Sequence, residues 1–209
     1  MKKSTAHIIH EYGPFPDSSS VHGVSYDGRH IWFANGDKLV ALDPANGKTL
    51  RSIDVPANAG TAFDGRHLYQ IASDHIQKID PESGRVLGTI PLPETAGASG
   101  LAWGESMLWA GAYQDRKIYQ IDPDSGAVLR VIESNRFVTG ISWAGDELLH
   151  GTWEDGASEL RHIDPDSGEV LETINMPAGT GVSGLESNGG NLLFCGGGDS
   201  GKIRVVRRA

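Results

Sequence analysis

The chain has 209 residues, a single cysteine and a formal net charge of −9. The negative balance argues against a nucleic-acid partner, because phosphate binding needs a dense surface of Lys and Arg. The lone Cys195 excludes a disulfide framework. No sustained apolar stretch predicts a signal peptide or a membrane span, so we expect a cytoplasmic protein with no membrane partner. The 28 glycines and 10 prolines are typical of short strands joined by tight turns.

In the first part of the chain, four short strands are predicted at residues 21–26, 31–35, 39–42 and 49–55. The run Asp43-Pro44-Ala45-Asn46-Gly47 predicts the last turn, because Pro fixes φ and Gly allows positive φ. Similar turns recur at residues 80–84, 122–126 and 164–168. We interpret their acidic residues as turn formers rather than as calcium ligands.

The four-strand unit recurs along the chain. Segments with a shared glycine open the first strand of each copy, and they begin at His22, Ala59, Ser99, Thr139 and Ser183. Their spacing of roughly 40 residues is typical of a repeat architecture, in which each copy is one supersecondary unit.

The two ends of the chain complement one another. The fifth copy ends after the predicted strand 203–206 and lacks its outer strand, whereas residues 5–12 form a surplus strand before the first copy. We therefore predict an all-β, five-bladed β-propeller with four antiparallel strands per blade. The N-terminal strand would pair in the last blade and close the ring. A β-sandwich is the alternative fold, but it does not account for the matched surplus and deficit.

One domain is expected over residues 1–209. Its blades would cover about residues 20–55, 57–90, 97–133, 137–176, and 181–209 together with 5–12. Loops on one rim of this ring differ in length and composition between copies, whereas the turns on the other rim are nearly identical. Binding chemistry is therefore expected on the variable rim, where the inner strands begin.

His22 is the most distinctive residue predicted at this rim, because every other copy has a small residue there. It is a candidate catalytic base or metal ligand, or it fills the channel and bonds to the backbone. His150 is interpreted as a packed core histidine. The remaining histidines show no metal-ligand spacing, so neither a metal nor a cofactor is predicted.

Several neighbouring residues complete the predicted site. Tyr113 and Trp153 occupy the same position in successive copies and form either an apolar ligand wall or a cap on the core.

Glu154 is the candidate partner of His22 in proton transfer, and Arg116 and Arg136 are candidate binders of an anionic group. Arg116 and Glu154 could instead form an orienting ion pair, or all three charged residues could be solvated loop charges. Asn35, at the end of strand 31–35, is included among the predicted substrate-binding residues. The basic cluster Arg204, Arg207 and Arg208 is interpreted as a solvated edge.

With the copies aligned, the chain resembles the five-bladed glutaminyl cyclases of plants and bacteria, also called glutamine cyclotransferases. The resemblance lies in the segments Leu68-Tyr69-Gln70-Ile71 and Ile76-Gln77-Lys78-Ile79-Asp80 and in the stretch from Asn135-Arg136 to Trp153-Glu154. The resemblance implies a pocket at the channel mouth in which an N-terminal glutamine is cyclised with loss of ammonia. Trp153 matches a tryptophan of the family.

Most of the catalytic positions that the resemblance implies are substituted. Ala59 stands where the family has its acid/base glutamate, Ser99 where a tryptophan is expected, and Thr139 near an expected amide. The expected lysine falls among Gly196–Gly198. The segments His22-Gly23-Val24 and Trp32-Phe33 also resemble segments of the streptogramin lyases, which are larger propellers.

Two functions remain open. In the first, the propeller is an enzyme that couples proton abstraction to elimination or cyclisation of a small polar or anionic molecule. His22 and Glu154 would transfer the protons. In the second, the same rim binds a ligand or a partner without turnover.

Overall fold

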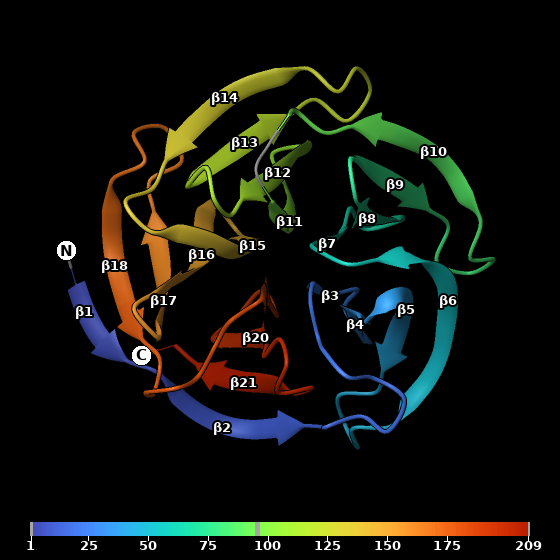
Figure 1. Cartoon of the computed structure of the whole chain (residues 1–209), viewed down its shortest axis with the longest axis horizontal. Coiled ribbons are helices and arrows are strands. Elements are labelled where there is room, and N and C mark those ends of the chain that lie inside the picture. The colour runs from blue at the N-terminus through green and yellow to red at the C-terminus, as the bar shows by residue number, and fades with distance from the viewer. Residues whose placement is uncertain (1, 95–96, 209) are drawn as a thin grey trace.

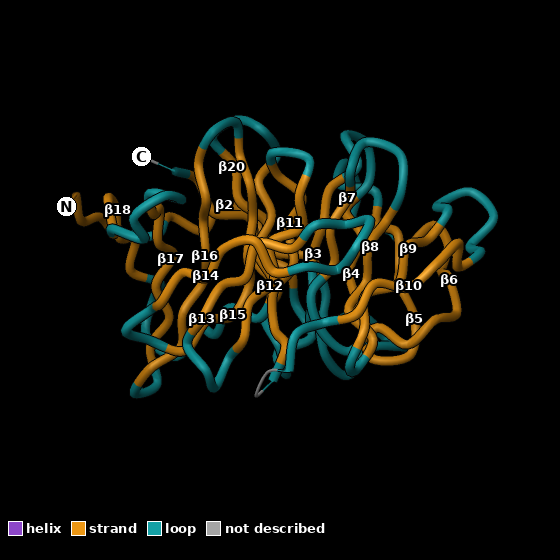
Figure 2. The backbone as a smooth tube through the Cα atoms, turned by 90° about the horizontal axis from the view of Figure 1, so that it is seen from above, coloured by secondary structure: helices purple, strands orange, loops and turns teal. Residues whose placement is uncertain are grey.

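The computed structural model describes residues 2–94 and 97–208, so the ends of the predicted domain at residues 1 and 209 and residues 95–96 lie outside it. Five β-sheets stand around a central axis (Figure 1). The predicted all-β five-bladed propeller is confirmed. Seen from the side, the loops gather at the two ends of the strands and form two rims (Figure 2). Within the described ranges, no helix is long and apolar enough to cross a membrane.

In blades one to three the strands run outward from the axis in chain order. Blade one contains β3 (Val24–Tyr26), β4 (Ile31–Ala34), β5 (Gly36–Leu42) and β6 (Thr49–Ala57). Blade two contains β7 (Thr61–Phe63), β8 (Leu68–Ala72), β9 (His75–Ile79) and β10 (Val86–Pro91). Blade three contains β11 (Ala98–Gly104), β12 (Met107–Ala112), β13 (Lys117–Ile121) and β14 (Val128–Glu133).

The last two blades contain the two ends of the chain. Blade four contains β15 (Phe137–Ala144), β16 (Glu147–Glu154), β17 (Ala157–Ile163) and β18 (Val170–Asn175), with β1 (Lys2–Thr5) on its outer edge. Blade five contains β19 (Gly184–Ser187), β20 (Leu192–Gly196) and β21 (Ile203–Arg207), with β2 (His7–Tyr12) outermost.

Strand β2 closes the ring as predicted. It pairs antiparallel with β21, with Tyr12 opposite Ile203 and His7 opposite Arg207. The pairing occupies the backbone groups of β21 that would otherwise form a free sheet edge.

Blade four departs from the prediction of four antiparallel strands, because β1 adds a fifth strand that runs parallel to β18. Its position is fixed by the backbone N–H of Ala6, which donates to the carbonyl oxygen of Asn175 at 2.8 Å, and by the ion pair of Lys2 with Glu172 at 2.9 Å. Residues 2–5 are all polar, so the sequence pattern gave no sign of a strand.

The inner strands approach one another so closely that only glycine fits at the contact. A Cβ atom on Gly100 would lie 2.4 Å from the carbonyl oxygen of Thr139 in the next blade. A Cβ atom on Gly184 would lie 2.4 Å from the carbonyl oxygen of His22, where blade five meets blade one. The shared glycine of the repeats therefore lets the blades converge on the axis.

Buried aromatic side chains pack the interfaces between blades. Trp109 of blade three stacks on Trp143 of blade four at 5.2 Å, and Tyr69 of blade two stacks on Trp103 of blade three at 5.4 Å. His150 lies in the middle of β16 and is 1% exposed, which confirms it as a core histidine.

Candidate functional site at the channel mouth

A cavity of about 600 Å³ opens at the rim where the inner strands begin. The residues that open the five repeats, namely His22, Ala59, Ser99, Thr139 and Ser183, all line it. The prediction that these residues surround the channel mouth is therefore confirmed. All five blades contribute to the wall, because their inner strands converge there.

His22 is a half-buried imidazole in this cavity. Its Nε2 lies 3.0 Å from the hydroxyl oxygen of Ser20. Burial lowers the pKa of His22, and the nearby carboxylate of Asp199 partly offsets that effect. The ring is therefore predominantly neutral at pH 7, so it has a lone pair with which to accept a proton.

Backbone bonds between blades one and five hold Asp199 near His22. Val21 and Gly198 exchange two backbone hydrogen bonds of 3.0 Å each. The hydroxyl of Ser183 donates to the carbonyl oxygen of Val21 at 2.6 Å and accepts the backbone N–H of Gly198 at 3.0 Å. These contacts anchor the loop that carries Asp199. Among the described residues, the Asp199 carboxylate makes no hydrogen bond or ion pair of its own.

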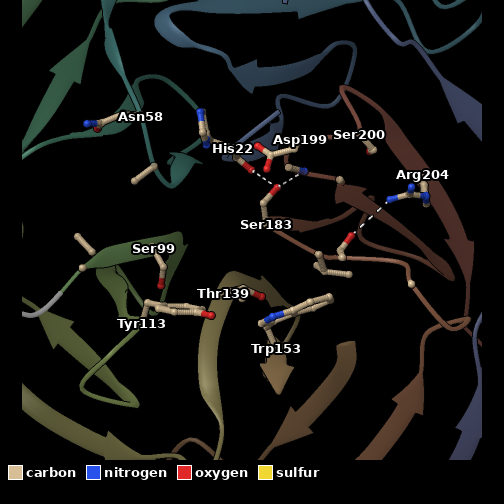
Figure 3. Close-up of a pocket in the computed structure, with 18 residues that line it drawn as sticks. His22, Asn58, Ser99, Tyr113, Thr139, Trp153, Ser183, Asp199, Ser200 and Arg204 are labelled. Carbon is tan, nitrogen blue, oxygen red and sulfur yellow. Dashed lines mark hydrogen bonds between the residues drawn. The ribbon is translucent and has the colours of Figure 1, made fainter. Parts of the chain in front are cut away.

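Tyr113 and Trp153 form an aromatic wall across the cavity from His22 and Asp199 (Figure 3). The Tyr113 ring stacks on Phe137 at 4.8 Å, and the Arg116 guanidinium lies over Phe137 at 4.3 Å. This packing supports Tyr113 from behind. An aromatic face that confronts a carboxylate is suited to a positively charged or polar ligand group.

The other predicted site residues lie outside this cavity wall. The Arg116 guanidinium pairs with Glu154 at 3.0 Å, and the Arg136 guanidinium pairs with Glu159 at 3.2 Å. Asn35 accepts the backbone N–H of Lys38 at 3.2 Å, within a turn. The structure thus brings together His22, Tyr113 and Trp153 but does not add Glu154, Arg116, Arg136 or Asn35 to them.

Sequence reasoning missed several wall residues, among them Asn58, Asp199, Ser200 and Arg204. The interpretation of Arg204 as part of a solvated edge is wrong, because its side chain is only 11% exposed. Its Nε donates to Glu11 at 3.0 Å, and its Nη1 donates to the carbonyl oxygen of Gly181 at 3.4 Å. The glycine run before Asp199 was the one sequence signal for this part of the wall.

The described residues provide no ready metal site, since no group of three or more His, Cys, Asp or Glu side chains among them is placed to hold an ion. The chemistry available in the wall consists of a neutral imidazole, a carboxylate, an amide, a guanidinium that is paired with Glu11, several hydroxyls and two aromatic rings.

Comparisons with known proteins support the fold. The crystal structure of Myxococcus xanthus glutaminyl cyclase superimposes with a TM-score of 0.82, and the match covers 99% of this chain and 97% of that one at 17% sequence identity. The resemblance to a glutaminyl cyclase thus holds for the whole fold. No protein-family model and no curated protein sequence matches the chain.

Other solved structures align with lower TM-scores. The WD40 repeats of RRP9 align with a TM-score of 0.60 at 10% identity, covering 97% of this chain and 99% of that one. Kuenenia stuttgartiensis hydrazine synthase aligns with a TM-score of 0.56 at 18% identity, covering 85% of this chain and 55% of that one. At these identities the similarity concerns the fold alone.

Proposed function

We propose that this chain binds a small polar molecule that carries an amine at the channel mouth and catalyses a proton-transfer reaction on it. The proposal rests on one observation. A single cavity is lined by the neutral imidazole of His22, the unpaired carboxylate of Asp199 and the aromatic rings of Tyr113 and Trp153. The carboxylate would hold the amine, and the aromatic faces would stabilise its charge. An anionic substrate is less well matched, since Arg116 and Arg136 pair with glutamates outside the wall and the Arg204 guanidinium in the wall already pairs with Glu11.

The cyclisation of an N-terminal glutamine is the first reaction to test, in view of the fold shared with Myxococcus xanthus glutaminyl cyclase. In this reaction the α-amine attacks the side-chain amide carbon, the C–N bond of the amide breaks, and ammonia leaves. One proton must leave the amine and one must reach the departing nitrogen. His22 would accept the first proton as a general base and deliver the second as a general acid.

The test is ammonia release from glutaminyl peptides by the purified protein. We expect turnover in the parent chain, and a loss of about 100-fold or more in His22→Ala, the range typical of a general acid–base residue. Asn35→Ala is the matched control, because Asn35 lies outside the cavity wall, and it should retain the parent rate. Equal rates in His22→Ala and the parent would refute the catalytic role.

A non-catalytic ligand-binding propeller is the second candidate. It is favoured by the hydrogen bond that already occupies Nε2 of His22 and by the small side chains at Ala59 and Ser99. In this case a cationic or amine-bearing ligand would raise the melting temperature of the parent and of His22→Ala alike. Trp153→Ala would abolish the shift, and no glutaminyl peptide would release ammonia.

A further inference from the structure

A second cavity, of about 230 Å³, lies between blades three and four, away from the channel mouth. Its apolar wall includes Ile118 and Ile132 from blade three and Ile163 and Val170 from blade four. Its polar part includes His150 and Arg161, which face one another across β16 and β17. The volume is below the roughly 300–1,000 Å³ of sites for drug-sized ligands, so it suits a small molecule.

The other blades show that the fold does not require a polar pair at this position. The equivalent cross-strand pairs are apolar in two of them, Phe33 with Val40 in blade one and Phe194 with Val205 in blade five. In blade two the pair is polar but uncharged, Gln70 with Gln77. In blade four, His150 is 1% exposed and Arg161 is 8% exposed. Burial of a charge and of an imidazole costs free energy that an apolar pair would not. Among these five pairs only that of blade four contains a charged residue, Arg161, so we look for a role of this pair beyond packing.

Arg161 is held in place with part of its hydrogen-bonding capacity unused. Its Nε and Nη2 bond the carboxylate of Glu159 at 2.9 Å each, and its Nη1 donates to Oδ1 of Asn135 at 2.7 Å. A guanidinium has five N–H groups, so two remain for a ligand. Glu159 also pairs with Arg136 at 3.2 Å. One carboxylate thus serves two guanidinium groups. The other carboxylate of the lining, that of Glu133, is exposed and therefore screened by solvent, so the buried Arg161 is the charge that a ligand inside the cavity would meet.

His150 supplies a hydrogen-bond acceptor beside this cation. Its Nδ1 lies 3.1 Å from the carbonyl oxygen of Gly151, so Nδ1 carries the ring proton. Burial and, to a smaller extent, the charge of Arg161 lower the pKa of His150 to about 4 against the opposing effect of the bond to Gly151, so the ring is neutral at pH 7. Nε2 then presents a lone pair, and no described residue donates to it.

We propose that this cavity binds a short aliphatic 2-hydroxy carboxylate. The carboxylate would accept the free N–H groups of Arg161, and the adjacent hydroxyl would donate to Nε2 of His150. The alkyl group would lie against the isoleucine and valine side chains. Glu133, the acidic residue of the lining, is exposed, and its side of the cavity gives the ligand an opening to solvent.

The test is calorimetric titration of the protein with 2-hydroxyisocaproate and with isocaproate, which lacks the hydroxyl. We expect one saturable site for the hydroxy acid and about 3- to 10-fold weaker binding of isocaproate, the value of one net hydrogen bond. The double variant His150→Phe/Arg161→Val gives blade four the Phe–Val pair that blades one and five have at this position. It should bind neither acid. His22→Ala, at the channel mouth, should bind both as the parent does.

A second variant distinguishes loss of the ligand site from a folding defect in the double variant. Val170→Phe fills the cavity while it keeps His150 and Arg161, and it should also lose binding. Three results would overturn the proposal: no saturable binding of the hydroxy acid to the parent protein at millimolar concentration, unchanged affinity in folded variants, or equal affinity for the two acids. Because the control at His22 concerns the other cavity, failure here would leave the proposed function of the channel mouth unaffected.

Discussion

Ser142 of blade four donates its hydroxyl hydrogen to Oε1 of Glu186 in blade five at 2.7 Å. Ser25 of blade one donates to Oε2 of the same carboxylate at 3.1 Å, and the backbone N–H of Ser187 donates at 2.8 Å. One carboxylate therefore links three blades. Burial nevertheless raises the pKa of Glu186 to about 7, although each of these hydrogen bonds lowers it.

The raised pKa of Glu186 makes stability depend on pH. Its folded-state pKa exceeds the ordinary value of 4.5, so its contribution is fully present below pH 4.5 and is lost as the pH rises through about 7. The loss is at most about 3 kcal/mol. We expect Glu186→Gln to lack this slope. Urea unfolding of both proteins at several values between pH 5 and pH 8 measures the difference, and parallel slopes would contradict the assignment.

His150 should produce a pH dependence of the opposite sign. Its folded-state pKa of about 4 lies below the ordinary 6.5, so its contribution is present above pH 6.5 and is lost as the pH falls towards 4. The loss is at most about 3 kcal/mol. Compared with His150→Phe, the parent should lose stability more steeply between pH 6.5 and pH 4. Because Glu186 acts against this trend, the two variants must be compared separately with the parent.

Gly100→Ala should destabilise the inner ring. The added Cβ would lie 2.4 Å from a carbonyl oxygen and 2.5 Å from a backbone nitrogen of the next blade, neither of which can move away freely. Overpacking of this kind costs about 1–3 kcal/mol or more, which corresponds to a fall of several degrees in melting temperature. Gly88→Ala in the outer strand β10 is the control, because nothing lies within 4 Å of its Cβ position. A similar fall in both variants would contradict the explanation.

Truncation should separate the roles of the first two strands. Removal of residues 1–5 takes away only β1, which is added to an already complete blade, and the protein should remain folded with a modestly lower melting temperature. Removal of residues 1–12 also takes away β2 and frees the edge of β21, so we expect loss of cooperative unfolding and aggregation. Thermal melts and size-exclusion chromatography distinguish these outcomes. A shorter variant as defective as the longer one would show that β1 itself is essential.

The titration of His22 is measurable by NMR. Because burial lowers the pKa of His22 and the Asp199 charge raises it, the midpoint should lie below 6.5 in the parent and fall further in Asp199→Asn. A midpoint unchanged by Asp199→Asn would show that the carboxylate does not act on the imidazole.

The repeat made the fold predictable, because the glycine before each inner strand and the Asp-Pro turns recur in the same order along the chain. The fifth copy lacks an outer strand, and a surplus strand precedes the first copy. This match predicted that the N-terminal strand closes the ring. Strand β1 could not be predicted, since it is polar and adds to the edge of β18 by backbone bonds that leave no side-chain pattern.

The candidate site was less predictable than the fold. The repeat predicts where a residue lies around the propeller axis, which is why His22, Tyr113 and Trp153 were found. Loop charges could not be placed in this way, because the direction of a long side chain depends on its ion-pair partner. Arg116 turns to Glu154 and Arg136 to Glu159, whereas Arg204 reaches the cavity wall while it pairs with Glu11.

The two N-terminal strands have consequences for the order of assembly during synthesis. β18 leaves the ribosome before β21, so residues 2–5 can dock on blade four while the partner of β2 does not yet exist. That early attachment would tether residues 7–12 beside the position that β21 later fills. It would shorten the search that otherwise makes contacts between the two ends of a polypeptide slow to form.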